Sequence, residues 1–486
     1  MQLTRIIIGL TLVLMLCGWA PAQQSAANAD QAAALLPEFR SDLDRASEWN
    51  RYTITATIEP TRPTISGRLV LEYTNRDTVA LDRLYFRLFP NLADFAGRLD
   101  ISAVMIGGQN RKIVYEQKRY LLRVDLPSQL RPGEKTVVAL DFQTSVPVNA
   151  GRKFYGAFNL QNSVFALASA YPLVAMVRSG AWDIAAPDTR GDLVNSETAL
   201  YDVTLIAPAD WTLITTGSAV DGRLDAGNQT ARFVSGPQRD FMIVAARLKA
   251  ASADVAGTKV NAYYLPGNEA GGQAALRAAV NAIQVYNTQF GRYPLAEFDL
   301  VPVDAGTFLG VEYPGITLIE QRLYRKPGQL EIVIAHEVAH QWWYSLVGNN
   351  VQNEAWMDEA LASYSQVIYA EAITGREAAN AELEQFRKSY RGVRAAKRDT
   401  VVKQPNQKIR NYYPIVYSKG ALFFQALRNQ IGDDAFGRFL KSYYADHRYG
   451  FVNGADLLGT AEQACSCQLD QLYRDWIETA APVAIP

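Results

Sequence analysis

Residues 336–364, HEVAHQWWYSLVGNNVQNEAWMDEALASY, hold two of the three histidines in this chain of 486 residues. They overlap a segment, residues 327–347, whose apolar residues recur at helical spacing with no helix breaker after Gly328. Residues four apart on a helix lie one turn above each other on the same face. His336 and His340 can therefore direct two imidazole nitrogens at one ion. The spacing predicts a metal site, and zinc accepts such ligands in tetrahedral coordination.

A catalytic zinc site takes three protein ligands and keeps one position for water, so this chain must supply a third ligand. A second helical segment, residues 353–371, follows a short loop and carries Glu354, Asp358 and Glu359. Spacing alone does not choose among these three acids. Glu337 points to the flank of the metal, where it can act as the general base for water. The alternative is that the two histidines make unrelated core contacts.

The rest of the chain divides into a β-rich half and a half that becomes helical. Apolar and polar residues alternate upstream of about residue 250, and Pro, Gly, Asn and Asp separate the runs. A helical pattern follows over residues 271–294, and the chain is mostly helical from Gly328 onward. We predict a multidomain α and β protein, with an antiparallel β-sheet domain at 46–250 and an α+β to helical domain at 251–486. The clearest strand patterns are YTITATIEP (52–60), GRLVLEYTN (67–75), RLYFRLFP (83–90) and ALYDVTLIAPADW (199–211).

The N-terminus has the layout of an export signal. A positive residue precedes an apolar run over residues 6–19, and a small-residue site follows at Ala22. We expect residues 1–22 to be a signal peptide cleaved near Ala22 and residues 23–45 to be a leader or linker. The protein is then exported, whether secreted, periplasmic or at the cell surface. An uncleaved anchor, or a lipid anchor at Cys17, is the alternative, and no later segment is predicted to span a membrane.

Charge and cysteine content argue against a nucleic-acid-binding protein and against a disulfide-rich scaffold. Lysine plus arginine (48) nearly cancels aspartate plus glutamate (49), which gives no electrostatic case for nucleic acid. The mature chain keeps Cys465 and Cys467, and the single residue between them leaves little room for a disulfide. We therefore interpret this pair as structural and expect neither a disulfide scaffold nor a metal site there. The sequence does not predict an oligomeric state.

Residues 336–364 closely resemble the zinc helix pair of the aminopeptidase N family, the gluzincin group that includes leukotriene hydrolase. In that family, eighteen residues separate the second histidine from the third ligand, a glutamate in a W-x-x-E context. That position here is Glu359, and the family's N-E-G is D-E-A in this chain. The resemblance implies that one zinc ion is held by His336, His340 and Glu359. It leaves Glu354 as an orienter of a histidine or as a plain surface acid.

Two more segments match the family. The loop at residues 309–313, LGVEY, resembles a variant of the family's G-x-M-E-N in which the first glycine, the methionine and the asparagine are replaced. The resemblance implies that Glu312 binds the free α-amine of the substrate, with Gly310 as a further substrate-binding residue. Residues 411–424, NYYPIVYSKGALFF, resemble the Y-x-K-G segment. The resemblance implies that Tyr417 stabilises the oxyanion, a charge that develops only in the transition state.

Three further residues in this half are not expected to take part in catalysis. Tyr412 and Tyr413 are expected to line the pocket without a catalytic role. His447, among aromatic residues, is interpreted as structural.

The resemblance covers nearly the whole mature chain and implies a fold and a function. The fold is a saddle-shaped β domain followed by a thermolysin-like catalytic domain, without the small β domain and the helical C-terminal domain that roofs the active site in longer relatives. The implied function is a zinc metalloaminopeptidase that acts on peptides outside the cytoplasm, with Glu337 as the base. The alternatives are a zinc endopeptidase of the same fold and a catalytically inactive binding module.

Overall fold

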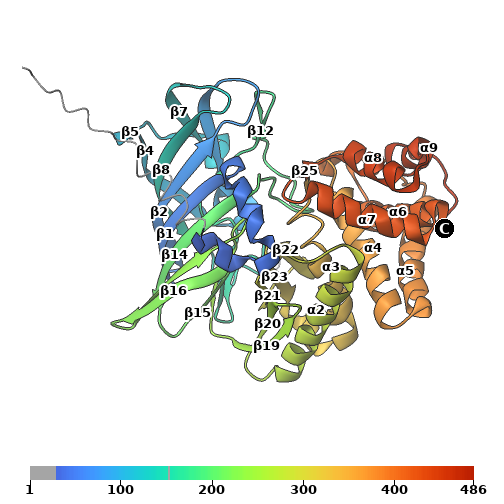
Figure 1. Cartoon of the computed structure of the whole chain (residues 1–486). Coiled ribbons are helices and arrows are strands. Elements are labelled where there is room, and N and C mark those ends of the chain that lie inside the picture. The colour runs from blue at the N-terminus through green and yellow to red at the C-terminus, as the bar shows by residue number, and fades with distance from the viewer. Residues whose placement is uncertain (1–28, 152–153) are drawn as a thin grey trace, which may run out of the picture.

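The computed structural model describes residues 29–151 and 154–486, so the predicted signal peptide lies outside the described residues. A β-rich N-terminal half is followed by a mostly helical C-terminal half, and the two halves lie side by side (Figure 1). The predicted fold class is confirmed. No helix in the described part of the chain combines the length and the apolar character needed to cross a bilayer.

Part of the predicted leader is packed against the C-terminal half. The 3-10 helix η2 (Pro37–Glu48) buries Leu43 and Ala46 in the core of that half. Asp42 accepts hydrogen bonds from Arg448 (2.9 Å) and from the hydroxyl of Tyr449 (2.9 Å). This helix therefore ties the start of the described chain to its C-terminal half.

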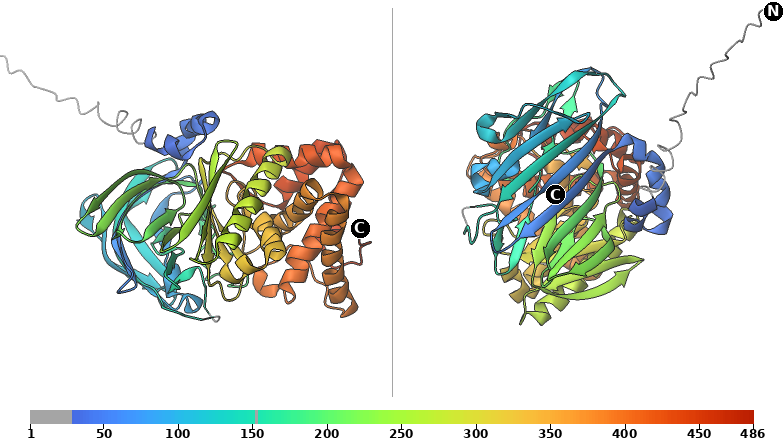
Figure 2. Two further views of the ribbon diagram at one scale, coloured as in Figure 1. Left: turned by 90° about the horizontal axis from the view of Figure 1, so that it is seen from below. Right: turned by 90° about the vertical axis from the view of Figure 1, so that its left-hand side faces the viewer.

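The N-terminal half is built on one large, strongly twisted sheet, which Figure 2 shows from two further sides. Burial alternates along β1 and β2, as expected for strands with one face on the core. Neighbours pair antiparallel, except that β1 and β14 are parallel with Tyr52 opposite Tyr201. The strand order is β16 (Ser218–Asp225), β17 (Asn228–Val234), β14 (Ala199–Pro208), β1 (Asn50–Glu59), β2 (Thr64–Thr74), β8 (Lys135–Ser145), β4 (Arg98–Ile106) and β5 (Gln109–Asn110).

Smaller sheets cover the inner face of the large sheet and enclose a core of aliphatic and aromatic side chains. One contains β15 (Thr212–Thr215), β18 (Ile243–Ala246), β10 (Val164–Leu167) and β9 (Phe158–Gln161). Another contains β11 (Leu173–Val174), β3 (Leu81–Arg87), β7 (Leu121–Leu130) and β6 (Val114–Glu116), and β12 (Val177–Arg178) pairs with β13 (Ala181–Trp182).

A five-stranded sheet begins the C-terminal half and ends in an edge strand that faces the helices. Its central strands are parallel, whereas the last strand runs antiparallel to its neighbour. The order is β19 (Lys249–Val255), β20 (Thr258–Tyr264), β21 (Glu297–Val303), β23 (Ile316–Glu320) and β22 (Gly310–Tyr313). A short pair, β24 (Gly348–Asn349) with β25 (Phe451–Val452), connects two distant loops.

The helices of the C-terminal half differ in how much of their surface is buried. α4 is buried along most of its length, as befits a core helix, whereas α5 buries one stripe that includes Leu383, Phe386 and Tyr390. The helices are α2 (Glu269–Gln289), α3 (Pro327–Ala339), α4 (Trp356–Ile373), α5 (Arg376–Ala395), α6 (Gly420–Ile431), α7 (Asp433–His447), α8 (Gly454–Cys465) and α9 (Asp470–Tyr473).

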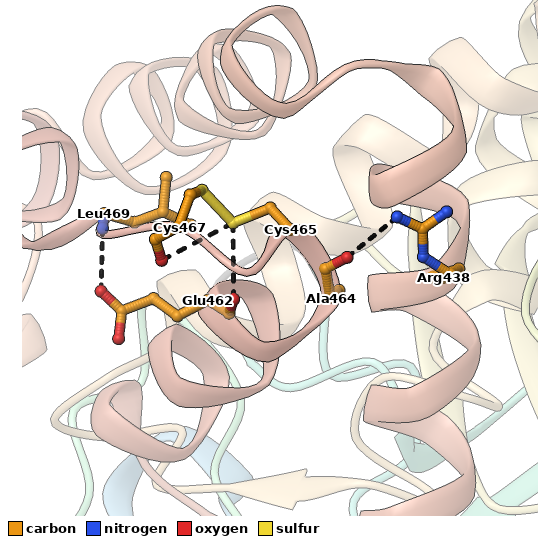
Figure 3. The surroundings of a disulfide bond; sticks show 6 residues. All are labelled: Arg438, Glu462, Ala464, Cys465, Cys467 and Leu469. Carbon is orange, nitrogen blue, oxygen red and sulfur yellow. Dashed lines mark hydrogen bonds between the residues drawn. A yellow bond between two sulfur atoms is a disulfide. The ribbon is translucent and has the colours of Figure 1, made fainter.

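The cysteine pair corrects a prediction, because Cys465 and Cys467 form a disulfide (Figure 3). The intervening Ser466 takes a left-handed conformation (φ 54°, ψ 42°) at the C-cap of α8. This reverses the chain and brings the two Cα atoms to 5.2 Å, within the usual range for a disulfide. Glu462 accepts a hydrogen bond from the Leu469 backbone (2.8 Å) and so fixes the chain beyond the bridge.

Candidate active site

α3 carries both histidines of the motif and ends at Ala339, not at residue 347 as predicted. His340 is its C-cap residue and keeps helical backbone angles (φ −63°, ψ −14°), so the one-turn spacing to His336 is retained. The chain then turns away, with φ of +125° at Tyr344. The turn leaves the carbonyl of Trp343 free to accept a hydrogen bond from Nδ1 of His340 (3.0 Å).

That hydrogen bond decides which nitrogen of His340 is available as a ligand. Because Nδ1 donates its proton to a carbonyl, Nε2 presents a lone pair to the site. The ring of His336 is likewise held by a hydrogen bond with Gln366. Both imidazoles are therefore oriented by the protein before any ion binds.

The two Nε2 atoms and Glu359 of α4 form a donor set that fits zinc. Nε2 of His336 lies 3.2 Å from Nε2 of His340, and Oε2 of Glu359 lies 3.2 and 3.3 Å from these nitrogens. Ligands bound tetrahedrally at about 2.0–2.1 Å are about 3.3–3.4 Å apart. Burial would raise the pKa of Glu359, but hydrogen bonds with the histidines outweigh it and lower that pKa to about 2. The donor set is thus two imidazoles and a carboxylate anion.

Glu337 lies beside this donor set with a carboxyl group that is largely unsatisfied. It is buried, and its Oε2 has no hydrogen-bond partner. Burial raises the pKa of Glu337 to about 8. The protein interior therefore makes this carboxylate a better proton acceptor than an exposed glutamate.

The edge strand β22 brings Glu312 and Gly310 against α3. Glu312 is buried, and its Oε1 lies 3.8 Å from Nδ1 of His340. Burial, and then the neighbouring Asp192, raise the pKa of Glu312. Gly310 touches the base directly, because a methyl group added at this glycine would overlap the carboxylate of Glu337.

We expect Gly310→Ala to lower kcat by at least about 100-fold, because displacing a reacting group by about 1 Å has an effect of this size. The added methyl must displace either the Glu337 carboxylate or the edge strand. Gly328→Ala is the matched control, since nothing lies within 4 Å of its methyl group. Steady-state kinetics of both variants, with zinc content measured, test this. An active Gly310→Ala enzyme would show that the close approach is not needed.

Tyr417 also contacts the donor set. It lies in a π-helical turn, Pro414–Lys419, a form often found at functional sites. Its hydroxyl donates a hydrogen bond to Oε1 of Glu359, and its ring stacks on His336 with centroids 5.8 Å apart. The fully buried Lys419 anchors this turn through an ion pair with Asp399 (3.1 Å).

We expect Tyr417→Phe to lower kcat by about 10²–10³-fold, the usual cost of losing one oxyanion donor. Tyr413→Phe is the matched control, because Tyr413 is 55 % exposed and stacks on Tyr417 with centroids 5.0 Å apart. KM is expected to change little in either variant, since the hydroxyl acts on charge that appears only in the transition state. Equal kcat values for the two variants would remove Tyr417 from the chemistry.

The structure separates other residues singled out in the sequence from the zinc ligands. Glu354 hydrogen-bonds the Gly454 backbone and lies 4.0 Å from Lys403, so it does not orient a histidine. Nε2 of His447 contacts the Thr460 hydroxyl (3.2 Å). Tyr412 packs on the ring of Tyr417 with centroids 6.1 Å apart.

One residue at the site, Asp192, was not predicted from the sequence. Asp192 comes from a loop of the N-terminal half, and its carboxyl group hydrogen-bonds Glu312. Burial, and then the charge of Glu359, raise the pKa of Asp192 to about 6. Glu312 lies 120 positions after Asp192 in the chain, and the zinc ligands lie farther still. No sequence pattern connects residues so far apart, so a single sequence could not place Asp192 at the site.

Two histidines one turn apart, a glutamate from the next helix and a buried base beside them define a zinc site of the metallopeptidase type. Residues 274–476 match the Peptidase family M1 domain, which covers both helices and the Tyr417 turn. This part of the chain is therefore similar to the M1 peptidase domain.

Proteins named as aminopeptidases are also similar to this chain. Aminopeptidase N of Lactococcus lactis subsp. lactis is 28% identical over 224 residues, which are 42% of this chain and 26% of that protein. Puromycin-sensitive aminopeptidase of Caenorhabditis elegans is 24% identical over 307 residues, 58% of this chain and 32% of that protein. The chain thus spans about a quarter to a third of the length of these relatives. An M1 zinc metallopeptidase structure from Deinococcus radiodurans has the same fold, with TM-score 0.71 and 21% identity over 90% of this chain and 95% of that one.

Proposed function

We propose that this protein is a zinc aminopeptidase that removes N-terminal residues from peptides outside the cytoplasm. The observation that carries the exopeptidase part is the buried carboxylate of Glu312, 3.8 Å from the ligand His340. In an aminopeptidase the peptide bond that is cut lies only one residue from the N-terminal ammonium. A carboxylate so close to the zinc ligands can therefore form a charged hydrogen bond with that ammonium. The names of the relatives point the same way.

The residues of the site have distinct roles in this proposal. Zinc, when bound by the three ligands, supplies a Lewis acid that polarises the scissile carbonyl and activates water. Glu337 accepts the proton of the attacking water and passes it to the leaving amine. Tyr417 donates a hydrogen bond to the oxyanion, and Glu312 fixes the free N-terminus of the peptide.

A peptide series tests the aminopeptidase proposal against the endopeptidase alternative. Purified, zinc-loaded protein is incubated with one peptide bearing a free N-terminus and the same peptide acetylated there. We expect removal of single N-terminal residues from the free peptide only, because acetylation removes the ammonium charge. Chelation of the zinc is expected to stop the reaction. Equal internal cleavage of both peptides would establish an endopeptidase, and no cleavage by the zinc-loaded protein would favour an inactive binding module.

Export is proposed from the apolar run at residues 6–19 and the small-residue site at Ala22, which lie outside the described residues. Cell fractionation and mass determination of the processed protein test it. A chain that begins at Gln23 in an extracytoplasmic fraction is the expected result. A full-length chain in the cytoplasm would contradict it.

A further inference from the structure

The turn that follows α3 sets the orientation of one zinc ligand. We call residues 341–348 the ligand turn. The carbonyl of Trp343 in this turn accepts the hydrogen bond from Nδ1 of His340 (3.0 Å), so the position of the turn fixes how that imidazole ring is oriented. The next residue, Tyr344, has a φ of +125°, which is rare for a bulky side chain. Such a backbone conformation persists only where the surrounding contacts hold it.

Arg239, from the N-terminal half, supplies contacts of this kind. Its Nε donates a hydrogen bond to the carbonyl of Tyr344 (2.9 Å), the residue directly after Trp343. Its Nη2 donates to the carbonyl of Gly450, which also accepts a hydrogen bond from the Gly348 backbone (3.1 Å). The guanidinium therefore holds the ligand turn directly at Tyr344 and, through Gly450, at its last residue.

The guanidinium of Arg239 is buried and forms no ion pair with a carboxylate of the described residues. Arg239 is 2 % exposed, and its Nη1 donates to the carbonyl of Ser196 (3.1 Å). Burial lowers the pKa of Arg239 to about 10, so the side chain stays charged at neutral pH. A buried charge is costly unless hydrogen bonds satisfy it, and here three backbone carbonyls do so. The rigid fork of guanidinium donors fixes these carbonyls relative to one another.

Arg239 itself is held firmly in place. A methyl group added at Gly348 would overlap the guanidinium carbon, and the ring of Phe451 lies with its centroid 5.8 Å from that carbon. The backbone carbonyl of Arg239 accepts hydrogen bonds from the hydroxyls of Ser196 and Tyr201. The arginine is thus fixed to the N-terminal half by its backbone, while its side chain reaches the C-terminal half.

We propose that Arg239 is a positioning residue for the zinc site, because it fixes the ligand turn from the N-terminal half and so orients His340. This role goes beyond the proposed peptidase function, since it concerns how the protein holds the metal ion and not which bond is cut. The two halves of the chain then act as one metal-binding unit, although all three ligands lie in the C-terminal half.

The zinc affinity of full-length Arg239→Met protein, measured by competition with a chelator, tests the proposal. We expect the affinity to fall by about 10–100-fold, the usual cost of losing a residue that orients a ligand. The visible absorption spectrum of the cobalt-substituted protein, which reports the geometry of the ligands, is expected to change as well. Arg239→Lys keeps the charge and three donors, so it is expected to bind zinc more tightly than Arg239→Met. Equal losses in the two variants would contradict the proposal.

Arg87→Met is the matched control for the loss of a buried arginine. Arg87 is 1 % exposed and forms an ion pair with Asp183 (2.8 Å) within the N-terminal half. We expect a lower melting temperature in both methionine variants, but an unchanged zinc affinity and cobalt spectrum in Arg87→Met. A purely structural role for Arg239 would give this same pattern in Arg239→Met, and that result would overturn the proposal.

Gly348→Ala tests the same contact without removing the arginine, because the added methyl must displace the guanidinium. We expect weaker zinc binding in this variant than in Gly328→Ala, whose methyl group has nothing within 4 Å. If Arg239→Met shows no cooperative melting, Gly348→Ala decides, and an unchanged zinc affinity there would overturn the proposal. All of these measurements concern metal binding, so their outcome does not depend on whether the protein is an aminopeptidase.

Discussion

Glu337→Gln is expected to lower kcat/KM by about 10³–10⁴-fold, at the upper end of what general acid–base catalysis contributes. Glutamine keeps the shape of the side chain but cannot accept a proton from water. Glu337 is not among the three zinc ligands, so the variant is expected to bind zinc as tightly as the unmodified protein. Loss of turnover with full zinc content is therefore the diagnostic result, measured by kinetics and elemental analysis on the same preparation.

Glu331→Gln is the matched control for this change. Glu331 lies on the same helix, where it accepts a hydrogen bond from the Tyr369 hydroxyl (2.7 Å) away from the ligands. We expect it to retain nearly full activity. If Glu337→Gln kept more than about a tenth of kcat/KM, another group would have to be the base, and a shared loss in both variants would indicate damage to α3 instead.

The metal site could be predicted from the sequence because its geometry is local. Two histidines on one helical face need only helical periodicity. The choice of Glu359 over Glu354 and Asp358 came from the resemblance to the aminopeptidase N family, because spacing does not distinguish these acids. The prediction did not find where α3 ends, since the turn after His340 depends on packing and on a left-handed region residue, Tyr344. The helical period nevertheless extends over both His336 and His340.

Residues that only the tertiary fold brings to the site could not be predicted from the sequence. Asp192 reaches Glu312 because a loop of the N-terminal half, residues 183–195, contacts the C-terminal half. No periodicity in the sequence encodes a contact between segments so far apart. A disulfide between Cys465 and Cys467 was not expected because only one residue separates them, yet a left-handed conformation at that residue accompanies the bond. In both cases a loop conformation decided the outcome, and loop conformation is weakly specified by local pattern.

Glu359→Gln is expected to abolish activity by removing the metal. The amide is uncharged, and the variant loses the one anion among the three ligands. Changing only a residue behind a ligand costs about 10–100-fold in affinity, so loss of the ligand itself is expected to exceed about 100-fold. Competition with a chelator measures the affinity. Glu354→Gln, which changes the rival acid beside Lys403, is expected to bind zinc normally.

Thermal denaturation gives an independent measure of the same event. A ligand that binds only the folded state at 1,000 times its Kd stabilises that state by about 4 kcal/mol. The unmodified protein should therefore melt at a higher temperature when zinc is added to the chelated form, as should Glu354→Gln. Glu359→Gln should show a much smaller shift at that zinc concentration, because an affinity weakened by about 100-fold or more leaves at most about 1.4 kcal/mol of stabilisation. If Glu354→Gln lost the zinc shift and Glu359→Gln kept it, the third ligand would be Glu354, and the donor triangle on α3 and α4 would be wrong.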